Sequence, residues 1–233
     1  MECEKDLPRK LVAEILGTMG LIIAVIGSVM LVNLTFKTLD TPLNVIVQGV
    51  AAFLVLFAML EALGKISGGH FNPAVTLAMI VSKETKASTG AFYMIAQIVG
   101  GLVGVLLLNI SFHESLTYSL MHINDAAPDG MGFLVISEIL CTFLLVTVVF
   151  GCIRSGSKKT SLAVAATVGG LIMVTASTFY ANPAVDIARI FAQSQDGIAP
   201  LTALYYIIAA IIGALIAAGL LSWLYPKEQP AEN

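Results

Sequence analysis

The amino-acid sequence predicts an all-α membrane protein: a bundle of six transmembrane helices plus two re-entrant half-helices, arranged as an inverted tandem repeat. Hydrophobic residues make up 58% of the 233 residues and charged residues only 12%, about half of the roughly 25% typical of soluble proteins. The mean hydropathy is +0.92, which is too apolar for a soluble core of this size. The apolar residues fall into six long runs and two short ones, and landmarks of the first half return in the second.

The six long runs predict the membrane-crossing helices. Most approach the ~20 residues that a helix needs to cross a ~30 Å hydrocarbon core. The first run is longer than the core of a signal peptide and shows no cleavage site, so we expect a transmembrane helix there. The fifth run is the shortest. The runs cover residues 11–34, 43–63, 87–110, 131–153, 161–177 and 202–224.

Two short apolar runs, 73–82 and 183–192, each have ten residues, enough for about 15 Å of helix or half a bilayer. Asn-Pro-Ala-Val opens both runs. Asparagine is among the best helix N-caps, and proline is favoured in the first helical turn. Asn-Pro is also a common turn signal. Its presence at the head of two half-length runs favours helix starts. The residues involved are Asn72, Pro73, Ala74, Asn182, Pro183 and Ala184.

Repeated landmarks indicate a duplication. AEILGT at 13–18 returns as SEILCT at 137–142, and QIVGG at 97–101 returns as AIIGA at 210–214. Each half holds three crossings, an odd number, so the second half must be inverted in the membrane. We therefore expect one membrane channel domain over residues 1–233. It is built from repeats at about 8–110 and 131–225, joined by a polar linker at 111–130.

The basic residues set the predicted orientation. With the N-terminus inside, only Lys37 and Arg189 of the 12 lysines and arginines fall outside, which fits the positive-inside rule. This predicts a multi-pass protein of the plasma (cell inner) membrane with both termini cytoplasmic.

The net charge of −3 gives no indication of a nucleic-acid partner. Cys3, Cys141 and Cys152 have no metal-ligand or disulfide spacing, and we expect no metal and no cofactor.

Inversion would bring the N-termini of the two half-helices together near the midplane. Each carries about half a positive elementary charge from the helix dipole, which opposes the entry of cations and protons. We expect Asn72 and Asn182 to cap their helices with oxygen and to aim N–H donors into a lumen. The preceding segments, 64–70 and 177–181, must then be non-helical backbone lining a water-filled path. The arrangement predicts passage of small neutral molecules.

Glu14 and Glu138 occupy matching repeat positions inside membrane spans. A charge there is costly and needs a partner. We hypothesise that each accepts backbone N–H bonds from a re-entrant loop and fixes the loop's shape. The alternative is a proton or ion relay.

Together, SGGHFNPAVT at 67–76, the second Asn-Pro-Ala, AEILGT and the duplicated layout resemble the aquaporin (major intrinsic protein) family over nearly the whole chain. The resemblance implies a homotetramer in the lipid bilayer with one pore per subunit. It also implies passive flux of water or small uncharged solutes, no enzymatic activity, and Asn72 and Asn182 as the asparagines that face the pore.

The family's outer constriction falls here on Ala52, Gly170, Phe179 and Val185. Water-selective members usually carry Phe, His, a small residue and Arg, and glycerol facilitators carry Trp, Gly, Phe and Arg. This chain keeps the Gly and Phe of the glycerol pattern but lacks the large aromatic residue and the arginine. The result is similar to a bacterial, aquaglyceroporin-like branch often linked with arsenic resistance. It implies a wide, apolar constriction that passes neutral metalloid acids such as arsenite.

Two residues are candidates for the pore mouths, His70 at the inner one and Arg189 at the outer one. Arg189 lies four residues after Val185, on the same face of the half-helix. It either supplies the missing positive charge further out or forms an ion pair with Asp186 or with lipid headgroups.

We therefore expect a passive channel for water, glycerol-like polyols and neutral metalloid acids such as arsenite. A water-selective aquaporin is an alternative, and so is an inverted-repeat secondary transporter. A cation channel is opposed by the paired positive helix ends and by the lack of a T-V-G-Y-G filter or an acidic ring.

Overall fold

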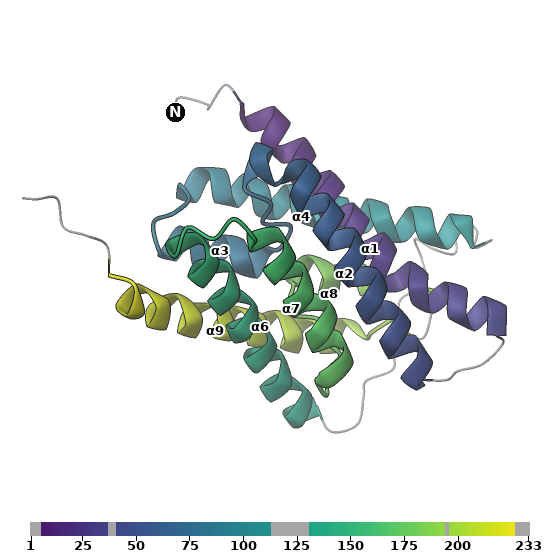
Figure 1. The fold of residues 1–233 in the computed structure, drawn as a ribbon. Helices are drawn as coiled ribbons and strands as arrows, with labels where there is room; N and C mark the ends of the chain where they lie inside the picture. Colours follow the sequence, from purple (N-terminus) through teal and green to yellow (C-terminus); the bar gives the residue numbers. More distant parts are fainter. Residues whose placement is uncertain (1–5, 37–40, 113–130, 194–195, 227–233) are drawn as a thin grey trace, which may run out of the picture.

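The computed structural model describes residues 6–36, 41–112, 131–193 and 196–226. Within these residues the fold is a bundle of helices (Figure 1). The predicted linker lies outside the described residues from residue 113 onward, as do Cys3, Lys5, Lys37 and Lys227. The helices are α1 (Leu7–Phe36), α2 (Thr41–Ser67), α3 (Pro73–Val81), α4 (Ala87–Ser111), α6 (Met131–Arg154), α7 (Thr160–Val174), α8 (Pro183–Arg189) and α9 (Pro200–Leu224).

The order of long and short helices is the one expected from the apolar runs. Five helices are long and apolar enough to cross a membrane: α1, α2, α4, α6 and α9. The sixth, α7, is apolar but has only 15 residues. It covers about 22 Å at 1.5 Å per residue. The chain bends after Val174 and turns back into the bundle, so the fifth predicted run is part helix and part loop.

The ends of two elements differ from the prediction. Residues 64–67, expected to be loop, continue α2 to Ser67, and the Gly68 N–H donates to the Gly64 carbonyl over 2.9 Å. The second half-helix, expected to reach residue 192, ends at Arg189. Beyond it the backbone forms turns in which Phe191 and Ala192 donate to carbonyls three residues back. Asn109 of α4 stabilises these turns by donating a hydrogen bond to the Phe191 carbonyl over 2.8 Å.

Close helix crossings repeat in the two halves. α1 packs against α2 and α4, and α6 packs against α7 and α9. At the α1–α4 crossing, a Cβ on Gly100 would lie 2.3 Å from the Ile15 carbonyl oxygen. At the α6–α9 crossing, a Cβ on Gly213 would lie 2.4 Å from the Ile139 carbonyl oxygen. Only glycine permits this approach of two backbones, as at many membrane helix interfaces.

Cys141 and Cys152 both lie on α6 and are free thiols, as the absence of disulfide spacing predicted. Cys141 is buried among core side chains.

We predict that Gly213→Ala destabilises the protein by about 1–3 kcal/mol, because the added methyl group would overlap a backbone carbonyl that cannot move aside. Thermal unfolding of the purified protein in detergent measures this as a lower melting temperature. Gly219 lies on the same helix with nothing within 4 Å of an added Cβ. Gly219→Ala should therefore leave the melting temperature unchanged or raise it. Equal losses from both substitutions would contradict the close-crossing account.

Candidate functional site

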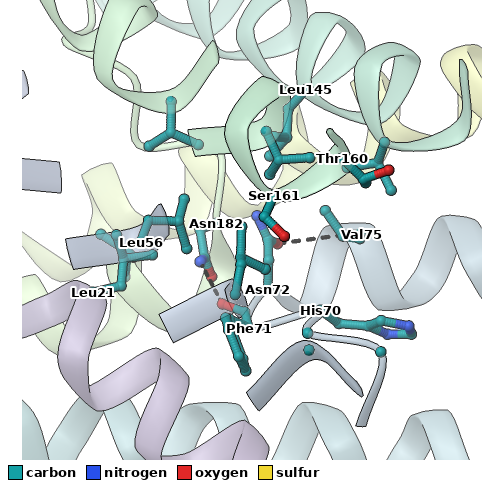
Figure 2. Close-up of a pocket in the computed structure, with 18 of the residues that line it drawn as sticks. Leu21, Leu56, His70, Phe71, Asn72, Val75, Leu145, Thr160, Ser161 and Asn182 are labelled. Atoms are coloured by element: carbon teal, nitrogen blue, oxygen red, sulfur yellow. Dashed lines mark hydrogen bonds between the residues drawn. The ribbon is translucent and has the colours of Figure 1, made fainter. Parts of the chain in front are cut away.

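The N-termini of α3 and α8 meet inside the bundle, and each asparagine donates a hydrogen bond to the other loop. The Asn72 amide donates to the Ala181 carbonyl over 2.8 Å. The Asn182 amide donates to the Phe71 carbonyl over 2.9 Å (Figure 2). Each side-chain NH₂ carries two donor hydrogens, so one of them on each asparagine is used inside the protein. The loops of the two repeats are thereby tied to each other.

The same asparagines cap their own half-helices, as the sequence predicts. The Asn72 side-chain oxygen accepts from the Ala74 N–H at 2.8 Å. The Asn182 oxygen accepts from the Ala184 N–H at 3.1 Å. Pro73 and Pro183 follow in the first turn, where a missing N–H costs nothing. All six Asn-Pro-Ala residues are buried.

The two re-entrant loops hold backbone conformations that side chains rarely adopt. Several non-glycine residues have positive φ, a region that costs about 1–3 kcal/mol per residue unless the surroundings enforce it. Such a geometry turns successive N–H groups to one side of the loop and leaves carbonyls on the other. The φ values are 47° at Phe71, 58° at Thr178, 56° at Phe179, 42° at Ala181, 96° at Gly68 and 63° at Gly69.

Glu14 of α1 holds the first loop from behind. Its carboxylate accepts from the backbone N–H groups of His70 at 3.1 Å and Phe71 at 2.7 Å. It also accepts from the Ser67 hydroxyl at 2.5 Å and the Gln97 amide at 2.6 Å. The side chain is fully buried. Four donors to one carboxylate satisfy a group that would otherwise be very costly inside a membrane.

Glu138 of α6 holds the second loop in the same way. Its two oxygens accept from the Tyr180 N–H at 3.0 Å and the Ala181 N–H at 2.5 Å. Ser137, next to it, accepts the Ser177 N–H at 3.2 Å. These are the loop contacts hypothesised for both glutamates. Neither glutamate is among the residues that line the cavity described below.

A cavity of about 400 Å³ lies in the bundle and is lined in part by the residues at which the two half-helices begin. The polar residues Glu61, Lys65, His70, Thr160 and Ser161 lie toward one end, which we call the inner mouth. Asn72 and Asn182 (Figure 2) also line the cavity, and most of the remaining lining side chains are apolar. The apolar lining comes from α1 (Leu21, Val25), α2 (Leu56, Leu60), α3 (Val75, Met79), α6 (Leu145, Val149, Ile153), α7 (Val164, Val168, Ile172) and the region around α8 (Phe179, Val185).

The predicted constriction residues divide into two pairs. Phe179 and Val185 line the cavity. Ala52 and Gly170 are not among the described lining residues. Ala52 is fully buried in the apolar core, and Gly170 has open space where a Cβ would stand. The structure thus brings two of the four to the cavity wall.

His70, a predicted pore-mouth residue, lines the cavity. Its ring nitrogen Nδ1 lies 3.1 Å from the Thr76 hydroxyl. The ring packs edge-on against Tyr93 at a centroid distance of 5.3 Å, and Tyr93 donates to the Ser67 carbonyl over 2.7 Å. The imidazole is therefore fixed in place.

Arg189 forms an ion pair with Asp196, a residue that the sequence analysis did not name as its partner. Its side chain is only 1% exposed, too buried to reach lipid headgroups, and its guanidinium lies 3.1 Å from the Asp196 carboxylate. It also stacks 4.0 Å over the ring of Tyr180. Asp186 points elsewhere: it is fully buried, and among the described residues neither of its oxygens has a hydrogen-bond partner.

Sequence reasoning missed Gln48 and Asp196. Gln48 of α2 is 2% exposed and donates to the Asp196 carboxylate over 2.5 Å. A signal existed, since an amide inside the apolar run 43–63 needs a buried partner. The partner could not be identified, because it lies 148 residues away in the sequence.

Two half-helices that meet end to end inside a bundle of membrane-spanning helices, and that help to line its cavity, are the architecture of a helical membrane channel. The chain belongs to the major intrinsic protein family, whose family model matches residues 3–180. It is therefore a multi-pass channel for water or glycerol-like solutes rather than an enzyme, and the predicted fold class is confirmed.

Several relatives align with almost the whole chain. Aquaglyceroporin AqpS of Rhizobium meliloti is 33% identical over 97% of this chain and 94% of its own. A glycerol uptake facilitator protein-like 6 of Lactiplantibacillus plantarum is 33% identical over 90% and 95%. Aquaporin Z of Photorhabdus laumondii is 27% identical over 95% and 99%. Among solved structures, the aquaglyceroporin from Plasmodium falciparum matches with a TM-score of 0.69 at 20% identity, over 95% and 96% of the two chains.

We predict that Glu138→Ala lowers stability and transport more than Glu138→Gln does. Alanine leaves two buried N–H groups without an acceptor, at about 1–3 kcal/mol each, whereas glutamine keeps one acceptor oxygen. Melting temperature in detergent and flux in proteoliposomes measure the two effects. Ile136→Ala, at a position 65% exposed on the same helix, is the control and should change little. Equal tolerance of Ala and Gln would exclude the loop-holding role.

Proposed function

We propose that this protein is a passive, uncoupled channel for small uncharged solutes: water, glycerol-like polyols and neutral metalloid acids such as arsenite. One observation carries the proposal, namely that most side chains lining the cavity are apolar, Phe179 and Val185 among them. An apolar wall provides no fixed charge to compensate the loss of hydration of an ion. Neutral molecules lose less hydration free energy than ions do on entering such a cavity.

The helix ends add to the barrier against cations. The N-termini of α3 and α8 both point to the middle of the path, each with a partial positive charge. The loop carbonyls and the second N–H of each asparagine supply hydrogen bonds for a neutral solute at that level. This favours uncharged molecules.

Val185 takes the position where the resemblance implies an arginine. A valine removes a bulky, charged hydrogen-bond donor from the wall, so solutes larger than water would pass. The relationship to an aquaglyceroporin and to a glycerol facilitator-like protein supports the same substrate class. We further propose a homotetramer in the plasma membrane, with repeats of opposite orientation and both termini cytoplasmic.

Stopped-flow light scattering on proteoliposomes tests this function with water, glycerol and arsenite. We expect flux above that of empty liposomes for all three, rising linearly with concentration. A channel that passes water alone would be a water-selective aquaporin. Saturable accumulation driven by an ion gradient would indicate a secondary transporter instead.

We predict that Val185→Arg lowers glycerol permeability at least about tenfold while water permeability falls less. The guanidinium would occupy part of the cavity beside the apolar wall and would bind ordered water. A polyol could displace that water only at a free-energy cost of more than about 1.4 kcal/mol. Val185→Leu is the control, since it changes size without charge. Unchanged glycerol flux in Val185→Arg would show that residue 185 does not border the path.

A further inference from the structure

Three polar side chains form a bridge beside the end of the cavity that lies away from the inner mouth. We call Gln48, Asp196 and Arg189 the outer bridge. Gln48 donates to the Asp196 carboxylate over 2.5 Å and to the Val25 carbonyl over 3.2 Å. Arg189 approaches the same carboxylate at 3.1 Å. The bridge therefore connects α1, α2, α8 and the segment after α8.

The outer bridge is in contact with the cavity wall. Val25, whose carbonyl accepts from Gln48, lines the cavity. Tyr180, over which Arg189 stacks at 4.0 Å, also lines it. Val185, another lining residue, stands one helical turn before Arg189. The bridge thus adjoins the cavity from two sides, and no described lining residue lies further along α8 than Val185.

The outer bridge lies one helical turn beyond the predicted constriction on two helices. Gln48 lies four residues before Ala52 on α2, which places it one turn further out on the same helix face. Arg189 lies one turn further out than Val185 in the same way. Ala52 and Val185 carry no polar side-chain group, and the polar groups of the outer bridge lie one turn beyond them on the same two helices.

The charges in the outer bridge are unequally accessible. The Asp196 side chain is 15% exposed and that of Arg189 only 1%. The Asp196 carboxylate is therefore the more accessible of the two charged groups. A carboxylate accepts hydrogen bonds from hydroxyl groups and repels anions. This is the opposite of an exposed arginine, which offers donors only.

We propose that the outer bridge, rather than Ala52 and Gly170, is the constriction that selects solutes. The Asp196 carboxylate accepts hydrogen bonds from the hydroxyl groups of polyols and undissociated oxyacids, and it discriminates against anions. Arg189 and Gln48 are positioning residues that hold the carboxylate at the end of the cavity. The inference rests on the proposed channel function and names the chemistry of its substrates: uncharged molecules with several hydroxyl donors.

Proteoliposomes of the full chain test this by the ratio of glycerol to water permeability. In Asp196→Asn the ratio should fall about tenfold, because a charge-assisted hydrogen bond to the solute is replaced by a weaker one. In Gln48→Leu the Asp196 carboxylate still pairs with Arg189 but loses its hydrogen bond to α2. The carboxylate should then be partly displaced, and we expect the glycerol-to-water ratio to fall about threefold. Melting temperatures of both variants are measured alongside.

The Arg154–Glu84 ion pair provides the matched control. It joins α6 to the turn after α3 at 2.5 Å, and neither residue lines the cavity. Glu84→Gln should leave the glycerol-to-water ratio at the wild-type value. A fall as large as in Asp196→Asn would show a general effect of losing an ion pair and would overturn the proposal.

The two proposals fail in different ways. Wild-type protein that passes neither water nor glycerol above empty liposomes refutes the channel function and, with it, the role of the bridge. A conducting wild type, with unchanged ratios in both Asp196→Asn and Gln48→Leu, refutes only the role of the outer bridge.

Discussion

The structure depends on satisfying backbone polar groups where no water reaches them. Two loops leave helical geometry in the interior of a membrane bundle, which is tolerated only where protein or a water-filled path supplies hydrogen bonds. Glu14 and Glu138 meet that need by accepting the N–H groups that immediately precede each asparagine. Once those N–H groups are fixed toward the glutamates, the loop geometry follows. The asparagines then stand where they cap one helix and contact the other loop.

The sequence predicts the helices well because membrane spans obey a simple length rule. A long apolar run must be satisfied internally and therefore forms a helix. The predicted C-terminal ends of α2, α7 and α8 were wrong. Nothing local marks residue 189 as a helix end. The helix stops because Asn109 of α4 binds the turn beyond it, and such a tertiary contact has no signature in the nearby sequence.

The site was predicted in part for the same reason. The capping asparagines and the glutamates carry local or repeated signals, and their contacts are those expected. The position of Arg189 on the helix was also clear, but its partner was not. Asp186 is three residues away and suited the pairing by spacing, whereas Asp196 lies in an irregular segment whose path depends on Gln48 of a distant helix. Ala52 and Gly170 were placed by resemblance, and sequence spacing does not show whether their backbone positions border the cavity.

The exchange of hydrogen bonds between the asparagines and the opposite loops has a consequence for biosynthesis. The Phe71 carbonyl finds its donor in a residue 111 positions later. At ribosomal speeds of about 5–20 residues per second, the first re-entrant loop waits on the order of ten seconds before that donor exists. During that interval Glu14, already synthesised on α1, supplies acceptors for the N–H groups of the waiting loop. The first repeat can therefore satisfy these N–H groups with its own glutamate before the second repeat has been synthesised.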